Sequence, residues 1–255
     1  AARAALEAKA DEVRILDNLS TGRRENLAAI PGHELIEGDV RDPEAVRRAA
    51  SGVEVVFHLA AQISVARSVE DPVETCDVNV TGTALVIREA IRAGAGRFVL
   101  SSSCAVYGSS PPLPSHERIP VAPLSPYAAS KLAGEHLASV HHALHGLEAV
   151  SLRYYNVYGP RQDPGSEYAA VIPKLASLMS AGRRPVIFGD GLQTRDFVCV
   201  RDVVAANLAA ARSPAAAGMV VNVGSGVRTD LIGLVGALNG ILGTGLRPVH
   251  EPPRQ

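Results

Sequence analysis

The sequence predicts an α/β fold, in which a doubly wound parallel sheet is followed by a smaller C-terminal lobe. Two observations support this expectation. In the first part of the chain, short runs rich in β-branched residues alternate with helix-like segments, which is the pattern of right-handed βαβ units. After Asn156 the alternation gives way to loops rich in glycine and proline, which indicates a second lobe.

The predicted strands of the first part are short apolar runs. They cover residues 12–17, 33–39, 53–60, 96–103 and 147–155. The run from Arg97 to Leu100 is typical of a strand buried in a parallel sheet. The serines that follow it, Ser101 to Ser103, should emerge at the carboxyl end of the strand, where open α/β sheets bind ligands.

The second part contains fewer regular elements. Its predicted features are loops at residues 159–160, 163–165 and 189–191, a helix near 168–180, a strand at 186–188 and a strand–helix pair from 219. We expect one domain over residues 1–153 and a partly interwoven lobe over 154–255, some of whose residues return to support the first.

Composition is that of an ordinary soluble enzyme. Of the 255 residues, 47% are hydrophobic and 20% are charged, so the chain can bury a substantial core. The formal net charge of -1 gives no support to a nucleic-acid or membrane-surface partner. No apolar stretch approaches the ~18 residues that span a bilayer, and no signal peptide opens the chain, so we expect a cytoplasmic location.

Cysteine and histidine residues give no sign of a metal site. Cys76, Cys104 and Cys199 lie far apart and form no CxxC, so we interpret them as reduced thiols. His141 and His145 have the spacing of helical metal ligands, but no HExxH pattern accompanies them, and a solvated helix face is favoured. We expect no metal.

The segment SPYAASK carries the clearest sign of chemistry. Ser125 suits a helix N-cap and Pro126 the first turn, and the i,i+4 spacing places Tyr127 and Lys131 on one face. A tyrosine titrates near pH ~10, and a neighbouring ammonium would lower its pKa toward the range of a general base. Such a pair alone is more often a snorkelling surface face, and the serines upstream favour the functional interpretation.

Several motifs follow one another along nearly the whole chain. They are LDNLSTG (16–22), GDVRD (38–42), HLAAQ (58–62), NVTGT (79–83), SSSCAVYG (101–108), SPYAASK (125–131), LRYYNVYGPRQDP (152–164), RDF (195–197) and VNVGSG (221–226). In these motifs the chain resembles the extended short-chain dehydrogenases/reductases, and within them the nucleotide-sugar epimerases and dehydratases. The resemblance implies a Rossmann-like NAD-binding domain and a substrate-binding lobe.

The resemblance also implies that the front of the fold is missing. In the family, a first strand and a GxxGxxG turn precede the first helix and hold the cofactor's pyrophosphate at the helix N-terminus. This chain begins inside that helix, at Ala1–Ala10, and it stops where the family has further substrate contacts. We therefore expect an incomplete piece of a longer enzyme, with a sheet that lacks its first strand.

The remaining cofactor residues indicate NAD. Asp17 ends a predicted strand, where its carboxylate can accept hydrogen bonds from the adenosine ribose and would repel the 2'-phosphate of NADP. The alternative for Asp17 is a helix or turn cap, which the sequence Asp-Asn-Leu-Ser also suits. By resemblance, the other NAD contacts are Asn18, Asp39, Val40, Leu59, Ala60, Ala61, Asn79, Ser101, Tyr127, Lys131 and Tyr155.

The resemblance assigns the chemistry to Ser103, Tyr127 and Lys131. Tyr127 would remove the proton from a sugar hydroxyl while NAD takes a hydride from the same carbon. Lys131 would lower the pKa of the tyrosine and hold the nicotinamide ribose. Ser103, the third serine of its triplet and the place of the family's polar partner, would hydrogen-bond the reacting oxygen.

The two residues after the serine triplet argue against dehydration. Sugar 4,6-dehydratases carry an Asp–Glu acid/base pair at this place and UDP-glucuronate decarboxylases carry a Glu, whereas this chain has Cys104 and Ala105. Neither residue can move a proton in that way. The reaction that remains is transient oxidation to a 4-keto sugar and re-reduction on its other face, as in a 4-epimerase.

The expected substrate is UDP-glucose, UDP-galactose or one of their N-acetylated forms, among which the sequence does not choose. By resemblance, the substrate contacts are Ser103, Asn156, Val171, Ile172, Phe188, Arg195 and Arg254. Arg195 and Arg254 could neutralise the diphosphate, for which the guanidinium fork is well suited. The alternative for either arginine is a surface salt bridge.

Two other interpretations stay open. One is a nucleotide-sugar oxidoreductase or dehydratase of the same family. The other is an inactive nucleotide-binding fragment, which the missing glycine-rich turn favours. The family also implies a homodimer formed through paired helices, which we expect to include residues 71–93 and 126–144.

Overall fold

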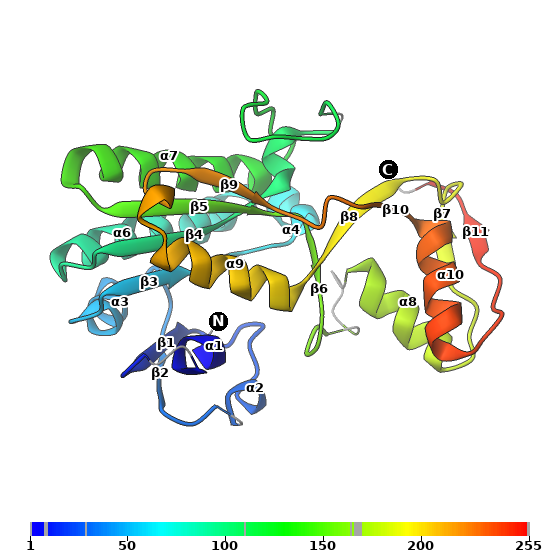
Figure 1. Ribbon diagram of the computed structural model, residues 1–255, viewed down its shortest axis with the longest axis horizontal. Coiled ribbons are helices and arrows are strands. Elements are labelled where there is room, and N and C mark those ends of the chain that lie inside the picture. Colours follow the sequence, from blue (N-terminus) through cyan, green and yellow to red (C-terminus); the bar gives the residue numbers. More distant parts are fainter. Residues whose placement is uncertain are drawn as a thin grey trace. The chain divides into compact units, whose positions relative to one another are not determined.

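The computed structural model describes residues 2–7, 10–28, 30–109, 111–163, 165 and 170–253 (Figure 1). The chain divides into two compact units. The first comprises residues 1–154 and 203–223, and the second comprises residues 155–202 and 224–255. Within the described part of the chain, no helix is both long and apolar enough to cross a membrane.

The first unit is built on parallel strands. Its main sheet has the order β3 (Val55–His58), β4 (Arg97–Ser103), β5 (Glu148–Tyr154) and β9 (Val220–Val223), and β1 (Val13–Asp17) pairs separately with β2 (His33–Glu37). Because all these pairings are parallel, the carboxyl ends of β3, β4 and β5 lie along one edge. The predicted α/β fold and each of its five predicted strands are confirmed.

Helices precede and follow these strands in alternation. They are α1 (Ala2–Glu7), α2 (Glu25–Ala28), α3 (Pro43–Ala50), α4 (Val65–Glu70), α5 (Pro72–Cys76), α6 (Gly82–Arg92) and α7 (Pro126–His145), with a π-helical turn at Asp77–Thr81 and 3-10 turns at Cys104–Tyr107 and Pro214–Ala216. Helix α9 (Val200–Arg212) begins in the second unit and continues into the first. The apolar faces of α6 and α7 meet the sheet in a core that includes Ile87, Phe98, Leu100 and Ala138.

Helix α7 begins and lies as its sequence predicts. The Ser125 hydroxyl accepts a hydrogen bond of 3.1 Å from the Ala128 backbone N–H, and Pro126 occupies the first turn. Further along, a Cβ at Gly134 would come within 3.3 Å of Leu100 Cδ2. The glycine therefore lets α7 approach β4 closely, which brings the polar side chains of the helix against the end of that strand.

The second unit has its own strands and core. It contains β6 (Asn156–Tyr158), α8 (Val171–Ser180), β7 (Val186–Phe188), β8 (Thr194–Cys199), β10 (Arg228–Asp230), α10 (Leu231–Leu242) and β11 (Val249–Glu251). Strand β8 pairs with β6 in parallel and with β10 in antiparallel orientation, and β7 pairs with β11. Residues such as Leu175, Met179 and Ile187 form its core.

The predicted elements of the second part are found with one change. The strand at 186–188 is present, and the helix predicted from Tyr168 is described from Val171, since Tyr168 lies outside the described residues. The strand–helix pair predicted from Met219 is interrupted: β9 joins the sheet of the first unit, and the short strand β10 precedes α10.

Candidate active site

Two predicted catalytic residues meet where β4 ends and α7 begins. The side chain of Ser103 acts on the phenol of Tyr127 and lowers its pKa, and the Ser103 hydroxyl accepts a 3.2 Å hydrogen bond from the Ala105 N–H. The second contact fixes the hydroxyl at the N-terminus of a 3-10 turn. Ser103 is therefore held as a rigid partner for the half-buried tyrosine.

Lys131 lies one helical turn after Tyr127 and is buried, with 7% of its surface exposed. Its Nζ donates a hydrogen bond of 2.8 Å to the Ser101 carbonyl oxygen. Burial lowers the pKa of Lys131 to about 8, because the ammonium has lost much of its hydration. The lysine stands close to the boundary between its charged and neutral forms at physiological pH.

The pKa of Tyr127 is shifted in the direction opposite to the one expected from the sequence. Burial raises the pKa of Tyr127, the hydrogen bond from Ser103 opposes that rise, and the proximity of Cys104 adds to it. Lys131 does not produce the expected lowering, and its ammonium is engaged with the Ser101 carbonyl instead. Ser103 is thus the residue that favours ionisation of the phenol in this structure.

His58 is a buried, neutral histidine close enough to Lys131 to sense its charge. His58 is 5% exposed, and its Nε2 lies 2.9 Å from the hydroxyl of Thr83, which donates to the Asn79 carbonyl at 2.6 Å. Burial, and after it the charge of Lys131, lowers the pKa of His58 to about 3. The imidazole therefore adds no second positive charge beside the lysine.

Asn79 supports the loop that follows β3. Its Oδ1 accepts from the Gln62 N–H at 2.8 Å, and its Nδ2 donates to the Gln62 carbonyl and to the Ser130 hydroxyl at 2.9 Å each. Asn79 is buried, so its contribution to a ligand is through this loop. In the same loop Leu59 and Ala60 are exposed and Ala61 is half-buried, which leaves a backbone that a flat ligand can approach.

The predicted adenosine residues gather after β1 and β2. Asp17 Oδ1 accepts a hydrogen bond from the Leu19 N–H at 2.8 Å. A Cβ at Gly22 would come within 3.0 Å of Asp17 Oδ2, so the absence of a side chain at Gly22 leaves this carboxylate oxygen accessible. Asn18 Nδ2 donates to Asp39 at 2.9 Å. Arg41 donates two hydrogen bonds of 2.8 Å to Asp39 and holds the pKa of that carboxyl well below its usual range.

Val40, the next predicted NAD contact, is buried in the core of the first unit, where a Cβ at Gly82 would come within 2.8 Å of Val40 Cγ2. Its side chain therefore faces the protein interior. Contact with a ligand at this position would fall to the backbone.

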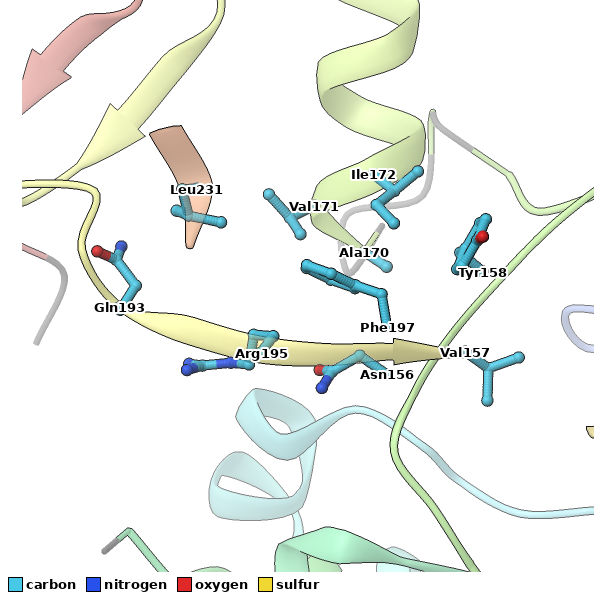
Figure 2. Close-up of a pocket in the computed structure, with 10 residues that line it drawn as sticks. All are labelled: Asn156, Val157, Tyr158, Ala170, Val171, Ile172, Gln193, Arg195, Phe197 and Leu231. Carbon is cyan, nitrogen blue, oxygen red and sulfur yellow. The ribbon is translucent and has the colours of Figure 1, made fainter. Parts of the chain in front are cut away.

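The second unit contains a pocket of about 280 Å³ (Figure 2). It is lined by Asn156, Val157, Tyr158, Ala170, Val171, Ile172, Gln193, Arg195, Phe197 and Leu231. In Figure 2, Phe197 rises from β8 toward Ala170 and Val171, at the start of α8. The pocket thus combines aromatic and aliphatic surface with a few polar groups, as small-molecule sites do.

Four of the predicted substrate residues line this pocket: Asn156, Val171, Ile172 and Arg195. Phe188 does not line it, and its carbonyl instead accepts a 2.9 Å hydrogen bond from Gln193 Nε2. Arg254 lies outside the described residues. Tyr155 is half-buried, and a Cβ at Gly224 would come within 3.2 Å of its ring.

Two pocket groups are held by neighbouring carbonyls. Arg195 Nη1 donates to the Thr194 carbonyl at 2.8 Å, so its side chain runs along β8, and Asn156 Nδ2 donates to the Asp196 carbonyl at 3.0 Å. Arg195 itself is exposed, which leaves its remaining N–H groups available for an anion.

Sequence reasoning missed Phe197 and Asp196. Phe197 is two residues after Arg195 on β8, and the alternation of side chains along a strand predicts that both line the same face. The Asp196 carboxylate accepts from the Ser225 N–H at 2.8 Å, the Ser225 hydroxyl at 2.7 Å and the Gly226 N–H at 2.8 Å. The motifs RDF and VNVGSG, both noted in the sequence, are therefore joined by this carboxylate.

Across the described part of the chain, no group of three or more His, Cys, Asp or Glu side chains could hold a metal ion. His141 and His145 stack on each other with ring centroids 5.3 Å apart.

Comparison with known proteins agrees with these motifs. The model of the NAD dependent epimerase/dehydratase family matches residues 1–224. A UDP-glucose 4-epimerase of Mycolicibacterium smegmatis is 44% identical over 244 residues, which are 94% of this chain and 77% of that protein.

Solved structures give the same result. A UDP-glucose 4-epimerase of Thermotoga maritima with UDP-glucose is 37% identical, with a TM-score of 0.92 over 98% of this chain and 80% of its own. A UDP-N-acetylglucosamine 4-epimerase of Methanobrevibacter ruminantium, in complex with UDP-N-acetylmuramic acid, is 36% identical, with a TM-score of 0.91 over 95% of this chain and 78% of its own.

Proposed function

Because the chain belongs to the NAD dependent epimerase/dehydratase family, we propose that it acts as a nucleotide-sugar 4-epimerase, an isomerase that uses NAD. Its substrates are UDP-glucose and UDP-galactose or their N-acetylated forms. The relatives at similar identity include epimerases of both kinds, so the choice between them belongs to experiment.

The observation that carries the proposal is the contact of Tyr127 with Ser103 beside the buried Lys131. A sugar hydroxyl held at this edge of the sheet meets Tyr127, whose phenolate form can take its proton, and a serine that can hydrogen-bond its oxygen. Cys104 and Ala105, which follow the serine, offer no acid–base pair for the loss of water. The site therefore supports epimerisation over dehydration.

The residues present fit NAD, which when bound accepts a hydride from the sugar and returns it. Asp17 offers a carboxylate at the end of β1, beside space kept by Gly22. Ala60 and Ala61 let a ligand approach the backbone after β3, and the Lys131 ammonium can donate further hydrogen bonds besides the one to Ser101. These groups hold and orient the cofactor, while Tyr127 moves the proton.

The pocket of the second unit is suited to the nucleotide part of the substrate. Phe197 and Tyr158 provide aromatic surface for a base, and the exposed guanidinium of Arg195 can pair with a diphosphate. Its volume of about 280 Å³ is close to the lower range of ligand pockets.

We also propose that the protein works in the cytoplasm as a homodimer. Cys76, Cys104 and Cys199 are all free thiols, as expected in a reducing compartment. On α5 and α7, Val73 and Leu144 are 69% and 70% exposed, which favours a partner on these helices. A monomeric mass by light scattering would refute the dimer.

The experiment that tests the function is chromatography of UDP-glucose and UDP-N-acetylglucosamine after incubation with NAD and the full-length protein. We expect the 4-epimer of at least one sugar without accumulation of NADH. Stoichiometric NADH would favour a nucleotide-sugar oxidoreductase instead, and conversion of neither sugar would contradict the proposal.

A further inference from the structure

Behind the serine triplet lies an ion pair that the proposed reaction does not use. Glu135 on α7 and Arg153 on β5 are 4% and 5% exposed. Arg153 donates from Nε to Oε1 at 2.9 Å and from Nη2 to Oε2 at 2.7 Å. Since the removal of two charges from water costs several kcal/mol, such a pair is weak evidence for stability and points to another role.

Ser102 connects this ion pair to the strand of the active site. Its buried hydroxyl donates a hydrogen bond to Oε1 of Glu135. Glu135 lies two turns after Tyr127 and one turn after Lys131, on the same face of α7. Consecutive residues of β4 therefore contact this face: Ser103 reaches Tyr127, the Ser101 carbonyl reaches Lys131, and the Ser102 hydroxyl reaches Glu135.

Arg153 is itself held on its other side. Its guanidinium carbon lies 4.8 Å from the centroid of the Tyr107 ring, and the Tyr107 hydroxyl donates to Asn222 Oδ1 at 2.8 Å. Asn222 belongs to β9, which pairs with β5. These contacts hold the ion pair in a fixed position in the sheet. A rotation of the end of β4 would therefore break the hydrogen bond between Ser102 and Glu135.

We infer that Glu135 and Arg153 are positioning residues that fix the rotation of the end of β4 through Ser102. Ser102 is the middle residue of the triplet, between Ser103, which acts on Tyr127, and Ser101, whose carbonyl accepts from Lys131. A hydrogen bond at this middle residue sets the orientation of both neighbours at once, and with it the contact of Ser103 with Tyr127. The inference rests on the proposed function for the roles of these neighbours.

The test follows the ionisation of residue 127 and does not need turnover. We would place 3,5-difluorotyrosine at position 127 and record its fluorine chemical shift against pH, since fluorination brings the phenol into the range where proteins stay folded. Because the Ser103 hydrogen bond lowers the pKa of Tyr127, Ser102→Ala should move the midpoint to higher pH by about 0.5–1 unit. Glu135→Gln should act in the same direction.

Two matched controls separate positioning from a general loss of packing. Ser151→Ala removes a buried serine of β5 that pairs with Leu100 of β4, and Glu89→Gln neutralises a buried acid of α6 that is paired with Arg88 and Arg92. Both should leave the midpoint where it is in the parent protein.

A midpoint in Ser102→Ala that coincides with that of the parent protein would overturn the inference, whether or not Glu135→Gln folds. So would an equal shift in the two controls. Conversion of the UDP-sugars is scored separately, so a failure of the proposed function is seen as absence of the 4-epimer and is not confused with an unshifted fluorine signal.

Discussion

The ammonium of Lys131 lies 2.8 Å from the carbonyl oxygen of Ser101, in a site where only 7% of the lysine is exposed. One hydrogen bond to a carbonyl does not replace the hydration that the ammonium has lost, which is why burial lowers the pKa of Lys131 to about 8. The charge of Lys131 therefore destabilises the folded state. Its position one turn after Tyr127 is explained by the proposed function.

Lys131→Met should raise stability at pH 7 while it abolishes turnover. The lysine is charged below pH 8 in the folded chain and below its ordinary pKa of 10.5 in the unfolded chain, so the folded state carries a penalty at low pH that fades as pH rises between these values. We expect a gain of about 1–3 kcal/mol at pH 7 that disappears toward pH 10.5. Thermal unfolding of both proteins across this range measures it, and a difference that stays constant with pH would contradict a buried, charged lysine.

Tyr127→Phe should lower the rate of epimerisation by a factor of about 10²–10⁴, because the proton acceptor is lost. NAD binding should be retained. The matched control is Tyr154→Phe, which removes a phenol that donates to Asn207 Oδ1 at 2.9 Å. The control should lose about 1 kcal/mol of stability and keep its turnover. Rates from chromatography and NAD affinities from calorimetry decide the matter; full activity of Tyr127→Phe would remove the mechanism.

The fold was largely predictable because its signal is local. Alternating β-branched and helical segments fix the parallel strands, and the cap Ser125–Pro126 fixes the start of α7. Strand β9 was harder to place. Its sequence identifies a strand, but the sheet that Val220–Val223 joins depends on contacts with β5, far away in the sequence.

The candidate site was predictable where motif spacing reports it, as for Tyr127 and Lys131. Contacts between distant segments were not: nothing near Glu135 in the sequence indicates Arg153, and nothing near Asp196 indicates Gly226. The predicted direction of the Tyr127 pKa shift was wrong, because the pKa depends on burial and spacing alone does not determine burial.

His58→Gln should reduce the sensitivity of the fold to acid. Burial, followed by the charge of Lys131, lowers the pKa of His58 to about 3, whereas an unfolded histidine titrates near 6.5. The unfolded chain therefore binds a proton first, and stability is lost as pH falls from 6.5 toward 3. Between pH 6.5 and 4.5 this group should account for about 2 kcal/mol of the loss.

Glutamine can keep a hydrogen bond to Thr83 and does not titrate, so urea unfolding at several pH values should show a shallower decline for His58→Gln. The control is His136→Gln, at an exposed position of α7. The prediction fails if the parent protein and His58→Gln lose stability in parallel over this range.

Asp17→Asn should weaken the preference for NAD over NADP. The amide keeps an oxygen for the Leu19 N–H, which now bonds to Asp17 Oδ1 at 2.8 Å, but it no longer repels a 2'-phosphate. We expect the ratio of the two affinities to fall about tenfold, which is the effect of removing one nearby like charge at the surface. Calorimetry with both cofactors measures the ratio; an unchanged preference would assign Asp17 to its turn alone.

Asp196→Asn should raise KM for the UDP-sugar with little effect on kcat, because Asp196 lies between two pocket residues, Arg195 and Phe197, and far along the chain from Tyr127. Its two oxygens accept hydrogen bonds from Ser225 and Gly226. An asparagine can supply only one such oxygen, so one donor would face an NH₂ group and the turn would separate from β8.

The expected rise in KM is about tenfold, because the loss of one hydrogen bond to a charged carboxylate costs about 1.5 kcal/mol. Asp42→Asn is the control, since Asp42 caps α3 in the first unit and asparagine caps a helix equally well. A fall in kcat at unchanged KM would show that Asp196 acts on the reacting centre, whereas unaltered kinetics would show that the turn at Ser225 does not shape the pocket. The split between the two constants therefore tests whether this pocket binds the substrate.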